Sequence, residues 1–209
     1  MKNLSKITSI ALIAAMAFGL AGCSLGGGKL AASKLKASAK KYGAEEYKDA
    51  DDFEDLDDDE IEDGAYITLS GKDSKDFLKD KDMTEDFYDK NAKSVTIFAV
   101  GEEDESTVII LNLSFGSKKN AESYYDDMVE IYEDYTDSEY ADVESDDGEE
   151  KGVTYSVCTA DAGYIGVVYG VYMSGSNVLI VMGVGDVGDC CDYIDDVASC
   201  YDIVLPSEL

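Results

Sequence analysis

The sequence contains no histidine, no tryptophan and only one proline, and lysine supplies all of its basic side chains because arginine is absent too. Without histidine, the chain has no imidazole that could act as a general base or as a metal ligand. Without arginine, it has no guanidinium that could hold a phosphate or a carboxylate through two parallel hydrogen bonds. These absences exclude histidine-dependent hydrolases, and the lack of tryptophan removes a common sugar-stacking residue.

Positive charge is also scarce. The 209 residues include 46 acidic and 17 basic side chains, which gives a formal net charge of -29 at pH 7. Binding to nucleic acid depends on cationic side chains that neutralise phosphates, so nucleic acid is not an expected partner. Hydrophobic residues nevertheless make up 45% of the chain, which is enough for one folded domain with a real core.

The amino terminus has the pattern of an export signal. Lys2 and Lys6 form a short basic region, and an apolar run from Ile7 to Phe18 follows them. This run is shorter than the roughly 20 apolar residues that a comfortable membrane-spanning helix needs. A basic start, a short apolar segment and small residues at its end are typical of a secretion signal.

Residues 20–23 are Leu-Ala-Gly-Cys, and they resemble the lipobox of bacterial lipoproteins. The resemblance implies cleavage before Cys23 and attachment of a diacylglycerol, with acyl chains such as palmitate, to its thiol. The membrane is then one expected partner, and the protein is expected at the extracytoplasmic face of the cell membrane. Only the first 23 residues carry this resemblance, so it implies a location and no activity. An uncleaved anchor and ordinary secretion are the alternatives.

Three segments follow along the chain. Residues 1–22 are expected to be the signal peptide, residues 23–63 a connector and residues 64–209 a single domain. The connector comprises the lipidated cysteine, a glycine-rich tether, a lysine-rich segment with weak helical amphipathicity at 29–44 and an acidic stretch at 49–63. The lysines could contact anionic lipid headgroups. The small apolar stripe favours a helix that merely begins the domain.

Clustered carboxylates at 49–63 are the ligand type that Ca²⁺ takes. An EF-hand loop that begins at Asp55 needs glycine at its sixth position and glutamate at its twelfth. The sequence has Glu60 and Tyr66 there instead. A solvated acidic connector is therefore favoured over a specific metal site, and we expect neither a metal nor a cofactor.

Residues 64–209 predict the α+β class. We expect an antiparallel sheet with its helices packed on one face, an acidic loop at 136–152 and one or two short polar helices at 73–90. The order strand-strand-helix occurs twice, so two related halves are one interpretation and a chance likeness is the other. Strands are expected at 65–69, 95–100, 107–115, 153–159, 164–173 and 178–184, and longer helices at 117–135 and about 188–200.

Four cysteines remain after Cys23, and an exported chain can keep disulfides. Either one bridge between a strand and the last helix or no bridge at all is compatible with the sequence. No Cys-x-x-Cys motif is present and no basic group lies nearby to lower a thiol pKa, so redox activity is disfavoured. The simplest role of these cysteines is to pack as small apolar side chains between a helix and the sheet. The candidate disulfide residues are Cys158, Cys190, Cys191 and Cys200.

Tyrosine is abundant, with 15 residues, which is more than a core of this size needs. On the strand expected at 164–173, one face carries Tyr164, Gly166, Val168, Gly170 and Tyr172. Tyr164 and Tyr172 could form a binding platform with shallow gaps over the glycines. The alternative, which we favour, is that the glycines let a helix approach the sheet closely.

No pattern in the sequence predicts catalysis, because 46 acids produce carboxylate pairs at any spacing by chance. We therefore expect a non-catalytic, lipid-anchored surface module that binds an unidentified protein or serves the cell envelope. The alternative is a lipoprotein that binds a small cationic solute or a divalent cation. An enzyme that uses carboxylates or cysteine is the third interpretation.

Overall fold

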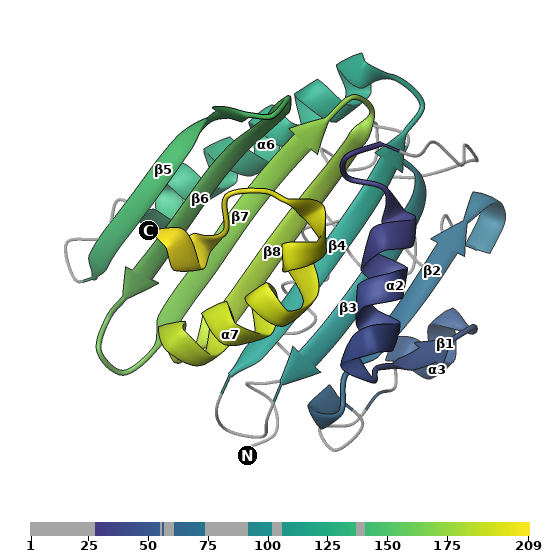
Figure 1. Ribbon diagram of the computed structural model, residues 1–209, viewed down its shortest axis with the longest axis horizontal. Helices are drawn as coiled ribbons and strands as arrows, with labels where there is room; N and C mark the ends of the chain where they lie inside the picture. The colour runs from purple at the N-terminus through teal and green to yellow at the C-terminus, as the bar shows by residue number, and fades with distance from the viewer. Residues whose placement is uncertain (1–27, 55, 57–60, 74–91, 102–105, 137–140) are drawn as a thin grey trace.

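The computed structural model describes residues 28–54, 56, 61–73, 92–101, 106–136 and 141–209. Eight strands are present in these ranges: β1 (Glu45–Tyr47), β2 (Ala65–Ser70), β3 (Ala92–Gly101), β4 (Thr107–Phe115), β5 (Asp142–Glu150), β6 (Val153–Asp161), β7 (Gly166–Ser174) and β8 (Asn177–Gly185). They form one sheet with the order β1-β2-β3-β4-β8-β7-β6-β5 (Figure 1). Only β1 and β2 are parallel to each other within this sheet. The predicted α+β class and antiparallel sheet are confirmed.

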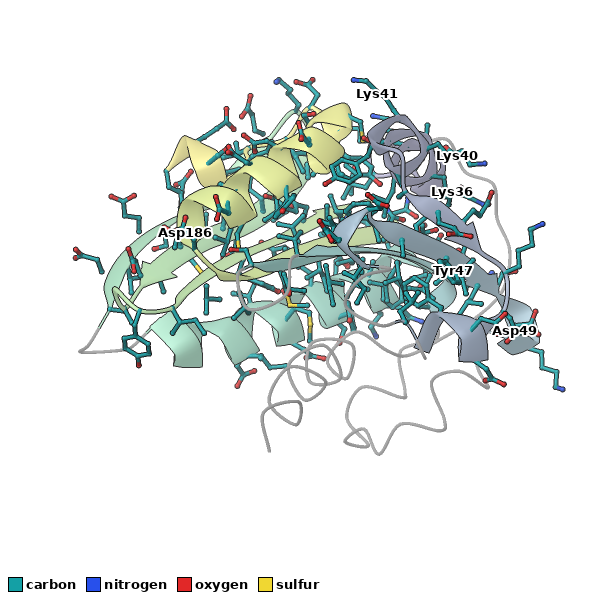
Figure 2. The ribbon with its side chains drawn as sticks, turned by 90° about the horizontal axis from the view of Figure 1, so that it is seen from below. Lys36, Lys40, Lys41, Tyr47, Asp49 and Asp186 are labelled. Carbon is teal, nitrogen blue, oxygen red and sulfur yellow. The ribbon has the colours of Figure 1, made fainter. Side chains whose placement is uncertain are left out.

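Helices cover both faces of this sheet, and not one face as we expected. They are α2 (Ala32–Tyr42), α3 (Ala50–Glu54), α6 (Lys118–Thr136) and α7 (Val187–Ala198), followed by the short 3₁₀ helices η2 (Ser199–Tyr201) and η3 (Pro206–Glu208). Figure 2 shows α2 and α7 on one side of the sheet and α3 and α6 on the other. Two hydrophobic cores result, one containing Tyr124 and Met128 of α6, the other Leu35 of α2 and Ile194 of α7. Burial on both faces explains why the central strands are continuous apolar runs.

A capping side chain precedes each of the two long helices. The Ser117 hydroxyl accepts a hydrogen bond from the Asn120 backbone N–H at 3.2 Å at the start of α6. At the start of α7, the Asp186 carboxylate accepts from the N–H groups of Gly188 at 2.9 Å and Asp189 at 3.2 Å. The face of this last helical segment that packs on the sheet is buried, and its residues are Cys190, Ile194, Val197 and Tyr201.

The strand-strand-helix order does occur twice, as β3-β4-α6 and as β7-β8-α7. β4 and β8 pair antiparallel at the centre of the sheet, from Thr107 opposite Val184 to Ser114 opposite Asn177. If a two-fold axis related the two halves, it would pass between these strands perpendicular to the sheet. Such an axis would place both helices on the same face. Because α6 and α7 lie on opposite faces, the repeat is one of element order and not of spatial arrangement.

The folded unit includes residues before position 64, where we expected the domain to start. β1 pairs with β2, and α2 packs beside α7 over β3 and β4. Leu30, just before α2, is fully buried. Its carbonyl accepts a hydrogen bond at 3.1 Å from Asn112 Nδ2, in the middle of β4. The lysine-rich segment is therefore the first helix of the domain.

Some expectations fall on residues that the structure does not describe. The signal peptide, Cys23 and the polar helices expected at 73–90 lie almost entirely outside the described residues, and the acidic stretch at 49–63 lies partly outside them. Within the described ranges, no helix combines the length and the hydrophobicity needed to cross a membrane.

Candidate functional site

Residues 142–150 form an edge strand and not part of the acidic loop expected at 136–152. Among the described strands, β5 pairs only with β6, from Asp142 opposite Asp161 to Glu150 opposite Val153. Backbone hydrogen bonds to β6 hold the strand, so its side chains can stay in water and need no hydrophobic pattern. Charged side chains are also typical of sheet edges, where they oppose pairing with other chains. The strand carries Asp142, Glu144, Asp146, Asp147, Glu149 and Glu150.

A groove of about 700 Å³ lies between this edge and α6. Two pairs of exposed carboxylates line its walls, Asp126 and Glu130 from α6 and Asp147 and Glu149 from β5. We call these four residues the groove carboxylates. The other lining residues are Tyr125 and Val129 of α6, Gly148 of β5, and Thr154, Tyr155 and Ser156 of β6.

The electrostatic environment of the groove is negative. Burial, together with the charges of Asp147 and Asp126, raises the pKa of Tyr125 to about 12. The nearby carboxylates therefore disfavour a further negative charge on Tyr125. At one end of the groove, Lys118 forms an ion pair with Glu122 at 2.7 Å, and the charge of Glu149 also raises the pKa of this lysine.

The groove carboxylates are spread along two walls and do not converge on one point. In the part of the chain that the structure describes, no three acidic or thiol side chains come together closely enough to hold a metal ion. Ca²⁺ needs six to eight oxygen ligands around a single position. An extended cation with several positive groups fits the spacing of this groove better, since each group can meet its own carboxylate.

The described part of the acidic stretch has a structural role. The Asp49 carboxylate accepts a hydrogen bond from the Asp51 backbone N–H at 3.0 Å, at the start of α3. Phe53 of the same helix meets Tyr47 edge to face, with ring centroids 5.8 Å apart. Tyr47 and Asp49 lie close together at one end of the sheet in Figure 2. These contacts fasten α3 to the sheet beside β1.

The four late cysteines are free thiols. Cys158 lies in the core on the α6 face, whereas Cys190, Cys191 and Cys200 lie on the α7 face. The sheet separates Cys158 from the last helix, so the strand-to-helix bridge that the sequence allowed is not formed. Burial raises the pKa of Cys158 to about 11 and that of Cys190 to about 12. These thiols stay protonated at neutral pH and are poor nucleophiles.

Tyr164 and Tyr172 do not form a shared platform. Tyr164 lies in the turn before β7 and is 89% exposed, whereas Tyr172 is fully buried on the α7 face of the sheet. A Cβ atom on Gly170 would lie 2.7 Å from the Tyr172 hydroxyl, and one on Gly166 would collide with Val187 at the start of α7. The glycines make room for the Tyr172 ring and for the helix, which is the alternative we favoured.

The groove was not predicted from the sequence, because its walls come from a helix and from residues assigned to a loop. The available signal is spacing. Asp126 and Glu130 are four residues apart, which places them on one face of a helix. Asp147 and Glu149 are two apart, which places them on one face of a strand. The pairing of these two faces follows only from the position of β5 at the sheet edge.

Comparisons with known proteins give little similarity. No protein-family model matches the sequence, and no curated protein is significantly similar to it. Among solved structures, the chain is similar to the extracellular domain of PknH from Mycobacterium tuberculosis, with a TM-score of 0.37 and 10% sequence identity. The match covers 55% of this chain and 65% of that one, just under two thirds of its length. Similarity at this level indicates neither a common fold nor a common function.

Proposed function

We propose that this chain is a non-catalytic module, held at the extracytoplasmic face of a membrane by a lipid on Cys23, that binds a basic segment of a partner protein in the acidic groove. The location rests on the basic and apolar leader and on the Leu-Ala-Gly-Cys motif at 20–23. The binding role rests on the groove between α6 and β5 and on its four carboxylates.

The groove fits a lysine-rich segment for two reasons. Its walls are straight elements of secondary structure that present carboxylates at regular spacing, so an extended chain or a helix can place successive lysines against them. The net charge of -29 also steers a cationic partner toward the protein before contact. Both effects weaken as salt rises.

A small polycation such as a polyamine is the second candidate ligand. The volume of about 700 Å³ lies within the range of small-molecule sites. Such sites usually bury most of the surface of their ligand. The groove carboxylates are exposed, and for this reason the protein partner is favoured.

The non-catalytic assignment rests on what the side chains can do chemically. The chain has no histidine to act as a base at neutral pH. Burial raises the pKa of the thiols of Cys158, Cys190 and Cys191, so a reactive thiolate is not formed there. The Asp195 carboxyl also has a raised pKa, chiefly from burial, but its Oδ1 accepts a hydrogen bond from the Ser207 hydroxyl at 2.8 Å beside η3.

Calorimetry tests the binding role. The mature chain with Cys23→Ser is titrated with a lysine-rich peptide, with spermidine and with Ca²⁺. We expect binding of the peptide, weaker binding of spermidine and no saturable heat with Ca²⁺. A groove variant with Asp126→Asn, Glu130→Gln, Asp147→Asn and Glu149→Gln should bind the peptide at least about tenfold more weakly.

The matched control removes the same number of charges elsewhere. It carries Asp142→Asn on β5 together with Asp189→Asn, Asp192→Asn and Asp196→Asn on α7, all of which are exposed. Equal loss of affinity in the two variants would show that only net charge matters and that the groove is not the site. Tighter binding of spermidine than of the peptide would favour the polyamine.

Lipid anchoring is tested separately in the cell. Wild-type protein should fractionate with membranes and should show, by mass spectrometry, an amino-terminal Cys23 that carries acyl chains. Cys23→Ala should remain as an unprocessed precursor or be released. Normal processing and membrane retention of Cys23→Ala would overturn the proposed anchor.

A further inference from the structure

One end of the sheet contains the point where the chain enters the domain, and we call it the tether end. Gly28 lies beside Asn177 at the start of β8, and the Lys29 ammonium lies beside Gly152 in the β5–β6 turn. A Cβ atom on Gly28 would lie 3.3 Å from Asn177 Nδ2, and a Cβ atom on Gly152 would lie 3.5 Å from Lys29 Nζ. The registers place the ends of β2, β4, β5 and β7 at this same end.

Lysines gather at the tether end. Lys93 is the second residue of β3, and its side chain lies beside Gly116, directly after β4. Lys118 and Lys119 form the first turn of α6, and Lys34 lies in the first turn of α2. The described lysines at this end are Lys29, Lys34, Lys72, Lys93, Lys118, Lys119 and Lys151, and those located elsewhere are Lys36, Lys40, Lys41 and Lys48.

Carboxylates at the tether end are partly neutralised. The Lys151 ammonium lies 2.9 Å from Asp202 and 3.3 Å from Glu150, and Lys118 lies 2.7 Å from Glu122. Lys29 and Lys119 are also exposed at this end, and the charge of Lys29 is among the causes that lower the pKa of the Asp202 carboxyl. The described lysines of this end therefore offset the negative charges of Asp202, Glu150 and Glu122.

The opposite end of the sheet carries aspartates, together with Lys40 and Lys41 in the last turn of α2. The β6–β7 turn follows Asp161, and α7 begins there with Asp186, whose carboxylate caps the helix, and Asp189. Figure 2 shows Asp186 at one end of α7, and the lysines of α2 across the molecule form their own group. Lys36 and Lys40 of that group pair with Glu46, at 3.7 Å and 3.0 Å. Lysines and carboxylates thus occur at both ends of the sheet, and the tether end differs in being the place where the chain enters the domain.

We propose that the tether end is a membrane-facing surface whose lysines contact anionic phospholipid headgroups and hold the domain upright, with Tyr164 and the β6–β7 turn directed away from the bilayer. This inference rests on the proposed lipid at Cys23. The seven residue steps from Cys23 to the buried Leu30 span at most about 25 Å, so a lipid on Cys23 keeps this end of the domain near the headgroups. Each lysine near an anionic surface then adds a modest attraction, which salt weakens.

The test measures orientation without relying on natural lipidation. The mature chain with Cys23→Ser is anchored to vesicles through an amino-terminal hexahistidine tag on a nickel-chelating lipid, because the sequence has no histidine of its own. The absence of tryptophan allows a single reporter to be introduced. Ser176→Trp places it in the β7–β8 turn at the tether end, and Tyr164→Trp places it at the opposite end.

Energy transfer from each tryptophan to a dansyl-labelled lipid is compared in vesicles of phosphatidylcholine with and without phosphatidylglycerol. We expect stronger transfer from Ser176→Trp than from Tyr164→Trp, and a difference that grows with phosphatidylglycerol and shrinks with salt. Adding Lys29→Gln, Lys93→Gln and Lys119→Gln should reduce the phosphatidylglycerol-dependent gain at least about threefold. The control with Lys40→Gln, Lys41→Gln and Lys48→Gln should keep it.

Equal transfer from the two positions, or a difference that does not respond to phosphatidylglycerol, would overturn the inference. So would equal effects of the two lysine triples, with circular dichroism confirming that both are folded. The absence of acyl chains on Cys23 in cells would instead overturn the proposed anchor, and the tagged protein distinguishes these two failures.

Discussion

Asn112 and Tyr201 are joined by a hydrogen bond of 3.1 Å, which Asn112 Nδ2 donates to the Tyr201 hydroxyl in the core between β4 and η2. The same Nδ2 also donates to the Leu30 carbonyl at 3.1 Å. Asn112 is 1% exposed and Tyr201 is 2% exposed, so water does not replace these bonds. A single amide therefore ties the entry of the chain, the centre of the sheet and the last helix together.

Substitution of Asn112 should destabilise the fold strongly. Asn112→Ala is expected to lower the free energy of unfolding by about 2–4 kcal/mol, because it leaves a cavity and removes the donor for two buried oxygens. Tyr201→Phe removes one hydroxyl and should cost about 1 kcal/mol. Urea unfolding of both variants measures the difference. Similar losses for both would mean that the bond to the Tyr201 hydroxyl carries most of the effect and that the cavity and the bond to Leu30 add little.

Gly183 should not tolerate a side chain. A Cβ atom there would lie 2.6 Å from Cys190 Cβ, because α7 packs directly on β8 at this point. Gly183→Ala is expected to cost about 1–3 kcal/mol, since it pushes the helix away from the sheet. Gly148→Ala on the exposed edge strand is the control and should change stability by less than about 1 kcal/mol, because only the Tyr155 side chain lies nearby. Thermal unfolding distinguishes the two, and equal effects would contradict close packing of α7.

Alkaline pH should weaken the fold through its buried thiols. Burial raises the pKa of Cys158 from 9.0 to about 11. Above pH 9.0 the unfolded chain releases this proton while the folded protein keeps it, so the associated stability is complete below pH 9.0 and is lost as pH rises through about 11. Cys158→Ala should flatten the decline of unfolding free energy over that interval. Val157→Ala, a buried neighbour that does not titrate, should lower stability without changing the slope.

The acidic side chains of β5 should protect the sheet from self-association. Asp142→Asn with Glu144→Gln is expected to promote aggregation, because these substitutions remove charge from an edge strand with a free hydrogen-bonding side. Light scattering against protein concentration measures this, with an onset expected at a severalfold lower concentration. Asp192→Asn with Asp196→Asn on the exposed face of α7 should leave the onset unchanged. A similar shift in both variants would indicate an effect of net charge alone.

Elements with strong local signals are predicted well from the sequence. β-branched runs locate β3, β4, β7 and β8, and capping residues and apolar spacing locate α6 and α7. β5 was missed because a strand at the sheet edge needs no apolar face, so its residues look like a polar loop. Pairing with β6 overrides their low strand propensity.

The sequence does contain a signal for helices on both faces of the sheet. Residues 108–111 and 178–182 are unbroken apolar runs, which are typical of strands covered on both faces. In an antiparallel sheet with one solvent-exposed face, apolar and polar residues alternate along each strand instead. The groove could not be found in this way, since its carboxylates belong to two separate segments. They come near each other only because α6 crosses the sheet as far as β6, the neighbour of β5.

The strand order places β8, the last strand to be synthesised, at the centre of the sheet between β4 and β7. A nascent chain makes β1 to β4 first, and the outer edge of β4 stays bare until residues 177–185 follow. In the finished protein nearly every residue of β4 is buried. Before β8 is made, the unpaired edge of β4 therefore exposes apolar side chains and backbone hydrogen-bonding groups that can pair with a strand of another chain. A polypeptide truncated before β8 would therefore aggregate rather than persist as a smaller folded half.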